Sequence, residues 1–174
     1  VQTLALALSK KGVVLGLCSK NNPDDVDDVL NNHKDMVLRN DDIVIKKVNW
    51  DDKVTNLKNI AKELNIGLDS LVFIDDSEFE VGFVRENLPM VEVFQVPKKE
   101  YNYSMMFREL TSLFYNPIHT KEDYNKLELY KTQIQRERLK GQTSSLEGYL
   151  ESLGLCIKIY IDDVEEIPRT AQLT

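Results

Sequence analysis

The sequence predicts an α/β fold, and three observations lead to this prediction. Short apolar runs rich in β-branched residues alternate with amphipathic helical patterns along residues 1–98, which is typical of parallel strands joined by right-handed helical crossovers. Polar side chains follow several of these runs, as they do at the ligand-binding edge of an open parallel sheet. From Tyr101 onward, consecutive helical patterns replace the alternation. We therefore expect a doubly wound, Rossmann-like parallel sheet followed by a mainly helical segment.

The composition indicates a soluble protein with one main domain and room for a second small piece. The 174 residues carry a net charge of −7 and are 42% hydrophobic, and this acidic balance argues against general nucleic-acid binding. No apolar run approaches the roughly 20 residues that cross a bilayer, and because Val1 leads directly into a helical pattern we expect no secretory signal. Cys18 and Cys156 lie in separate apolar runs without metal-type spacing. We expect free thiols and a reducing, cytoplasmic location, without a nucleic-acid or membrane partner.

The first two elements are a helix over residues 2–11, which Gly12 ends, and a strand over residues 13–18. The near-continuous apolar run of that strand is typical of burial on both faces. The following elements are, in order, a helix over 23–32, a short strand over 36–38, an ambiguous small strand or buried loop within 39–50, a helix over 51–65 that stops at Gly67, a strand over 71–74, a helix from 78 to about 87, and a strand over 91–96.

A polar turn follows the first strand, and it has two readings. Ser19, Lys20 and Asn21 place a hydroxyl, an ammonium and an amide at one strand end, where they could bind a phosphate together with backbone N–H groups. The alternative is a plain polar turn that leads into a helix, with Asn22 as its cap and Pro23 at its first position.

Lys53 is unusual because it stands in the first turn of the helix over 51–65. A cation there opposes the helix dipole by a few tenths of a kcal/mol, so a bound anion would rationalise it. The alternative is an exposed lysine that pairs with Asp51 or Asp52.

Asp75 and Asp76 directly follow the apolar strand over 71–74, and Ser77 can cap the next helix. Two neighbouring carboxylates repel each other, so a site that holds both is favoured when a cation neutralises them. Oxygen ligands suit Mg²⁺. The alternative is that one aspartate caps the helix and the other is solvated.

The C-terminal part predicts a short amphipathic helix near residues 105–114, a long charged helix over 121–140, a helix from 144 or 145 to 153, and an alternating strand over 155–161. This change from alternating strands and helices to consecutive helices marks a boundary near residue 98.

Taken together, the polar groups resemble those of the haloacid dehalogenase superfamily of phosphotransferases. The sequences of the motifs resemble those of one subgroup, the FkbH-like proteins, more closely still. The matching segments are Cys18–Asn22, Val48–Leu57, Val72–Ser77 and Ile167–Thr174. The resemblance implies that Ser19 and Lys53 hold the phosphoryl group and that Asp75 and Asp76 hold Mg²⁺. Lys20 and Asn21 belong to the same implied substrate site.

One departure concerns the nucleophile. The superfamily's first motif is Asp-x-Asp-x-Thr at the end of a strand, and no such motif follows an apolar strand in this sequence. Asp25-Val26-Asp27 lies in a predicted helix and lacks the threonine. In the family the motif would precede Val1, so we expect a fragment that is inactive alone and binds Mg²⁺ weakly.

The resemblance also implies a domain plan and partners. Residues 1–98 would be the haloacid dehalogenase-like domain without its first strand, 99–154 a helical appendage, and 155–174 the start of an acetyltransferase-like domain. FkbH-like proteins are associated with transfer of a glyceryl unit from 1,3-bisphosphoglycerate to an acyl carrier protein. Two other classes compete with the enzyme: a phosphate- or partner-binding module without catalysis, and a receiver-like signalling domain. In receiver domains the acidic pair ends the first strand and the lysine follows a late strand. Here the lysine comes before the acidic pair, and this reversed order argues against that class.

Overall fold

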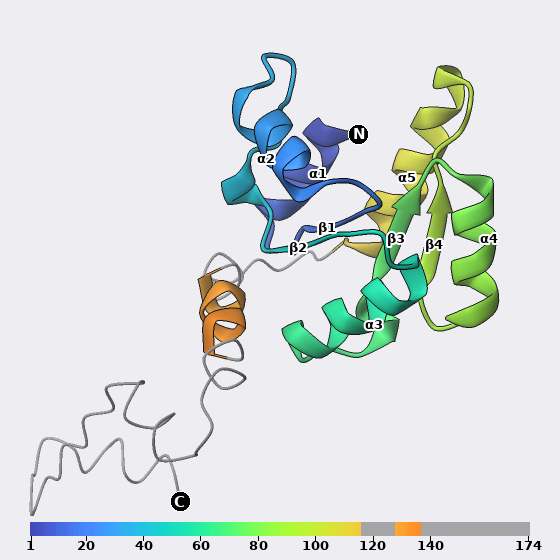
Figure 1. The fold of residues 1–174 in the computed structure, drawn as a ribbon. Coiled ribbons are helices and arrows are strands. Elements are labelled where there is room, and N and C mark those ends of the chain that lie inside the picture. The colour runs from blue at the N-terminus through green and yellow to red at the C-terminus, as the bar shows by residue number, and fades with distance from the viewer. Residues whose placement is uncertain (116–127, 137–174) are drawn as a thin grey trace, which may run out of the picture. The chain divides into compact units, whose positions relative to one another are not determined.

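Short parallel strands, each followed by a helix, form the framework of residues 1–98 (Figure 1). The computed structural model describes residues 1–115 and 128–136, all within one unit, Val1–Glu137. Its main elements are α1 (Gln2–Ser9), β1 (Gly16–Ser19), α2 (Pro23–Asn32), β2 (Ile45–Val48), α3 (Lys53–Leu64), β3 (Val72–Asp75), α4 (Glu78–Asn87), β4 (Glu92–Gln95) and α5 (Tyr103–Leu113). Single 3-10 turns lie at Asn40–Asp42, Leu68–Ser70 and Glu100–Asn102, and a further helix covers residues 128–136.

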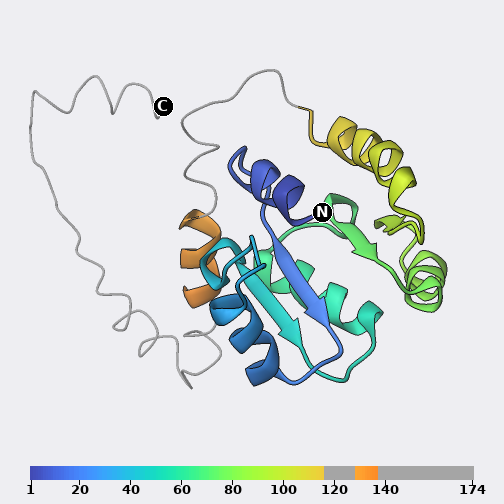
Figure 2. The same cartoon turned by 90° about the horizontal axis from the view of Figure 1, so that it is seen from above.

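The strands form two parallel pairs. β1 pairs with β2 in the register Gly16 to Ile45, and β3 pairs with β4 in the register Val72 to Glu92. Figure 1 shows the arrows of β3 and β4 side by side and pointing the same way, and Figure 2 shows the same for β1 and β2. The sequence predicts one sheet, whereas within the described residues the hydrogen bonds join the strands only inside each pair.

β1 uses one edge for β2, and no strand within the described residues pairs with its other edge. The carbonyl of Leu15 accepts the N–H of Val44 at 2.9 Å, and the carbonyl of Ser19 accepts the N–H of Asn49 at 3.1 Å. Backbone groups alternate in direction along a strand. The N–H and C=O of Cys18 therefore face the edge opposite to β2.

β3 has the same asymmetry. The carbonyls of Leu71 and Asp75 accept the N–H groups of Glu92 and Val96, at 3.1 and 2.9 Å. Ile74 therefore directs its backbone groups to the edge opposite to β4. In the part of the chain that the structure describes, each pair thus has one strand edge without a partner strand.

Helix α3 packs into both apolar clusters of the described chain. Val54 and Leu57, in its first half, belong to a cluster completed by Phe73, Val81, Val84, Leu88, Val91 and Val93. Ile60 and Leu64, in its second half, belong to a cluster completed by Ile45 and Ile134. Burying each such side chain contributes roughly 1.5–3 kcal/mol. The amphipathic stripe that predicts this helix therefore also connects β2 to the β3–β4 pair.

Two strand predictions are corrected. The segment over 36–38 is not a strand, because the N–H groups of Val37 and Leu38 bind the side-chain oxygen of Gln2 at 2.7 and 3.3 Å. β1 begins at Gly16 and not at Val13, and it includes Ser19. The ambiguous stretch contains β2.

Helix ends agree closely with the sequence, with corrections at α1 and α3. α1 ends at Ser9 and not at Lys11. α2 and α4 have the predicted bounds. α3 begins at Lys53 and not at Asp51, because Asp52 is its cap, and it ends at Leu64. Its C-terminal cap is Asn65, which adopts the left-handed conformation with φ 53° and stops the helix before Gly67. Asparagine tolerates this conformation better than most residues because its short side chain can bond locally.

The predicted helix over 121–140 is described only at residues 128–136, where it is helical. The helix predicted to end at 153 and the strand over 155–161 lie outside the described residues. Within the described part, helices are too short or too polar to span a membrane.

Candidate functional site

Lys53 joins the two strand pairs at their carboxyl ends. It is the first residue of α3 and is only 6% exposed. Its ammonium donates to the carbonyl of Cys18 at 2.6 Å and lies 3.3 Å from the Asp75 carboxylate. It also lies 5.9 Å from the centre of the Phe73 ring. The alternative of an exposed lysine paired with Asp51 or Asp52 is therefore wrong.

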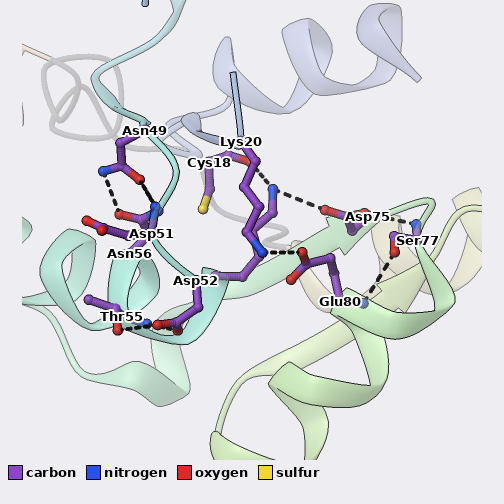
Figure 3. Close-up of polar contacts among 11 residues, drawn as sticks. Cys18, Lys20, Asn49, Asp51, Asp52, Thr55, Asn56, Asp75, Ser77 and Glu80 are labelled. Carbon is purple, nitrogen blue, oxygen red and sulfur yellow. Dashed lines mark hydrogen bonds and ion pairs between the residues drawn. The ribbon is translucent and has the colours of Figure 1, made fainter. Parts of the chain in front are cut away.

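Asp52 allows a lysine to open this helix. Its two carboxylate oxygens accept the backbone N–H and the hydroxyl of Thr55, both at 2.8 Å (Figure 3). These bonds, the backbone one foremost, hold the pKa of Asp52 below its usual value. A carboxylate at the helix N-terminus favours the dipole that Lys53 opposes.

Asp75 fixes the turn after β3. One oxygen accepts the N–H of Ser77 at 2.9 Å, and the other faces Lys53. Ser77 is the cap of α4, and its hydroxyl accepts the N–H of Glu80 at 3.3 Å. The helix is therefore capped by Ser77 and not by an aspartate. Asp76 is exposed, which leaves its carboxylate available to a cation.

A second ion pair links the same two regions. The ammonium of Lys20, from the turn after β1, donates to Glu80 on α4 at 2.7 Å (Figure 3). This hydrogen bond raises the pKa of Lys20. Glu80 is 9% exposed, and its second oxygen is buried without a hydrogen-bond partner in the described structure.

Sequence reasoning missed Glu80. Ser77 and Glu80 have the spacing of a capping box, in which the glutamate would bond back to the cap residue. Here the serine half of the box forms, while the glutamate binds Lys20. The spacing of Ser77 and Glu80 was the available signal, but it indicates a helix cap and not the contact with Lys20.

The remaining predicted site residues lie at the end of β1 and in the turn that follows it. Ser19 is half-buried at the end of β1. Asn21 is exposed and uses its side-chain oxygen to accept the N–H of Asn22 at 2.8 Å, so its side chain shapes the turn. Cys18 is a free thiol, and burial raises its pKa although Lys53 acts in the opposite direction.

The donor chemistry suits a small hard cation. Asp75 and Asp76 offer carboxylate oxygens, which Mg²⁺ prefers. Within the described residues, however, no group of three or more His, Cys, Asp or Glu side chains could hold a metal. The aspartates therefore fit as part of a coordination shell that water and other oxygens must complete.

The comparisons support the fold. The chain is similar to the N-terminal part of the protein BF1531 from Bacteroides fragilis, which contains a phosphatase domain and was crystallised in complex with Mg. The TM-score is 0.61 at 36% identity, and the match covers 66% of this chain and 30% of that chain. No family model matches the chain, and no curated protein does either. The predicted α/β fold of the haloacid dehalogenase type, with parallel strands and helices, is therefore confirmed.

Proposed function

We propose that the chain forms the phosphate- and Mg²⁺-binding part of a Mg²⁺-dependent phosphatase of the haloacid dehalogenase type, acting on a phosphorylated small molecule. The observation that supports this most is the position of Lys53, whose buried ammonium lies between β1 and the Asp75 carboxylate. The likeness to a phosphatase domain crystallised with Mg supports it independently.

Each candidate residue then has a role. Lys53 and Ser19 bind the non-bridging oxygens of the phosphoryl group, and Lys20 and Asn21 line the same site. Asp75 and Asp76 would hold Mg²⁺, which supplies positive charge to the phosphoryl oxygens. Since Lys53 already contacts Asp75, the ammonium is oriented before a phosphate arrives.

The nucleophile in this proposal is the first aspartate of an Asp-x-Asp-x-Thr motif at the end of a further strand, and this sequence does not contain the motif. The edges of β1 and β3 that have no partner strand within the described residues suit a strand that ends beside Lys53. A carboxylate at its end would attack phosphorus and form an acyl phosphate while the P–O bond to the leaving group breaks. A second carboxyl group would protonate the leaving oxygen and later activate the water that hydrolyses the acyl phosphate.

A finer proposal follows from the FkbH-like motifs. The complete protein would be cytoplasmic and would transfer a glyceryl unit from 1,3-bisphosphoglycerate to the thiol of an acyl carrier protein. Only the resemblance of the segments Cys18–Asn22, Val48–Leu57 and Val72–Ser77 supports this.

Two measurements test the phosphatase. In the 174-residue chain, Lys53→Met is expected to weaken the binding of inorganic phosphate in the presence of Mg²⁺ by roughly 10- to 100-fold, the value of one charge-assisted hydrogen bond. Lys58→Met is the matched control, because Lys58 is exposed on the same helix. In the full-length protein, Lys53→Met should lower acyl-phosphate turnover by about 100-fold or more, and removal of Mg²⁺ with a chelator should abolish it.

The results also separate the enzyme from a phosphate-binding module without catalysis. Phosphate binding without turnover in the full-length protein would indicate the module. Equal phosphate affinity in the Lys53→Met and Lys58→Met chains would contradict both functions.

A further inference from the structure

Two asparagines form a closed amide pair beside the site. Asn49 follows β2, and Asn56 lies on α3 with 0% exposure. The amide nitrogen of Asn56 donates to the Asn49 oxygen at 2.8 Å, and that of Asn49 donates to the Asn56 oxygen at 3.1 Å (Figure 3). The Asn49 oxygen also accepts the N–H of Asp51 at 3.0 Å. The pair thus binds the loop before α3 to the body of the helix.

The pair belongs to a ring of contacts that includes the lysine. The backbone N–H of Asn49 donates to the carbonyl of Ser19 at 3.1 Å, which ties the pair to the end of β1. Asn56 lies almost one helical turn after Lys53, and the Lys53 ammonium returns to β1 at the Cys18 carbonyl. The start of α3 is therefore attached to the end of β1 in two ways: through the Asn49–Asn56 pair at Ser19 and through the Lys53 ammonium at Cys18.

Apolar packing alone does not give the same precision. The two clusters on α3 hold the helix by non-directional contacts, which tolerate a small slide or rotation. A reciprocal amide pair is directional, and a buried amide left without a partner is costly. The hydrogen bond of Lys53 at 2.6 Å is lost after a displacement of about 1 Å.

We propose that the Asn49–Asn56 pair positions the Lys53 ammonium between β1 and Asp75. Asn49 and Asn56 are positioning residues in this proposal, since they act through Lys53. The position of the ammonium is a property of the fold alone. Its effect on phosphate affinity rests on the proposed function.

The test uses Asn56→Asp in the 174-residue chain, with Asn59→Asp as the control, because Asn59 is exposed one turn later on α3. The readout is the ammonium resonance of Lys53 in ¹H–¹⁵N NMR, assigned by its loss in Lys53→Met. At neutral pH the introduced carboxylate faces the Asn49 oxygen without a proton to donate. We expect the resonance to shift or broaden in Asn56→Asp and to stay unchanged in Asn59→Asp.

Lowering the pH distinguishes positioning from general damage. Burial raises the pKa of the introduced carboxyl group, and its protonated form can donate to the Asn49 oxygen again. The Lys53 resonance of Asn56→Asp should therefore return toward the wild-type signal recorded at the same pH. A signal that is unaffected by Asn56→Asp in the folded chain, or one that does not recover, would overturn the proposal.

A second variant keeps the test decisive. Asn49→Asp retains the acceptor for Asp51 and Asn56 and loses only one donor, so it is the milder change. If neither variant folds, the pair is a requirement of the core and the positioning role is wrong.

Inorganic phosphate is the second probe, and Asn56→Asp should weaken its binding by about tenfold. If wild type itself does not bind phosphate, the proposed function fails, and the resonance alone decides this inference.

Discussion

Asp52 is the residue whose charge has the most direct link to stability. Both of its carboxylate oxygens accept hydrogen bonds from Thr55, and its pKa is lowered in the folded chain. A carboxyl group with a depressed folded pKa contributes its stability above the unfolded pKa of about 4. That contribution is lost as the pH falls through the folded pKa.

This sign predicts the behaviour of Asp52→Asn, which keeps a cap acceptor but does not titrate. Its Tm should lie below that of wild type by a constant amount between about pH 5 and 8, and the difference should shrink below about pH 4. Asp51→Asn is the control, because Asp51 is exposed. Thermal melts followed by circular dichroism measure both. A difference that stays constant down to pH 2.5 would contradict the account.

Single residues of the site were predictable where a local rule applied to them. Lys53 stood out because a cation in a first turn conflicts with the helix dipole. Glu80 and Asn56 did not stand out, because their roles depend on partners from other elements. Lys20 and Glu80 are 60 residues apart in the chain, and Asn56 depends on Asn49. The patterns around Asp75 and Lys53 indicated that both lie at one sheet edge, within a few ångströms of each other, and the 3.3 Å distance between the Asp75 carboxylate and the Lys53 ammonium confirms this.

Among the elements, helices were predicted more accurately than strands. The bounds of α2 and α4 follow from local signals, namely Pro23 at a first position and the Ser77 cap. Strand limits depend on a partner: β1 is limited to the residues that β2 pairs. The segment over 36–38 looks like a strand, but Gln2 satisfies its N–H groups instead. A side chain from a distant helix leaves no periodic signal.

At the scale of the whole molecule, the predicted boundary near residue 98 remains a prediction. Lys98 and Lys99 are exposed beside a single 3-10 turn, Glu100–Asn102, whereas Met106 and Leu110 of α5 are buried. If the helical part is an appendage, brief trypsin digestion should cut first between Val96 and Ser104, as mass spectrometry of the fragments would show. Lys53, buried in α3, should stay uncut at that stage. Uniform resistance between Val96 and Ser104 would instead favour a single domain in which the helices cover the sheet.

The two strand pairs also have a consequence for folding. Helix α2 lies between β1 and β2 in the chain, and α4 lies between β3 and β4, so each pair closes through its own local crossover. Pairings that are local in sequence form fast, and such units often open separately in native-state hydrogen exchange. Amides of β1 and β2 should therefore share one opening free energy, and those of β3 and β4 another. α3 amides should follow the more stable pair, since this helix packs into both clusters. One common opening free energy for all four strands would mean that the two strand pairs, joined through α3, unfold together as a single cooperative unit.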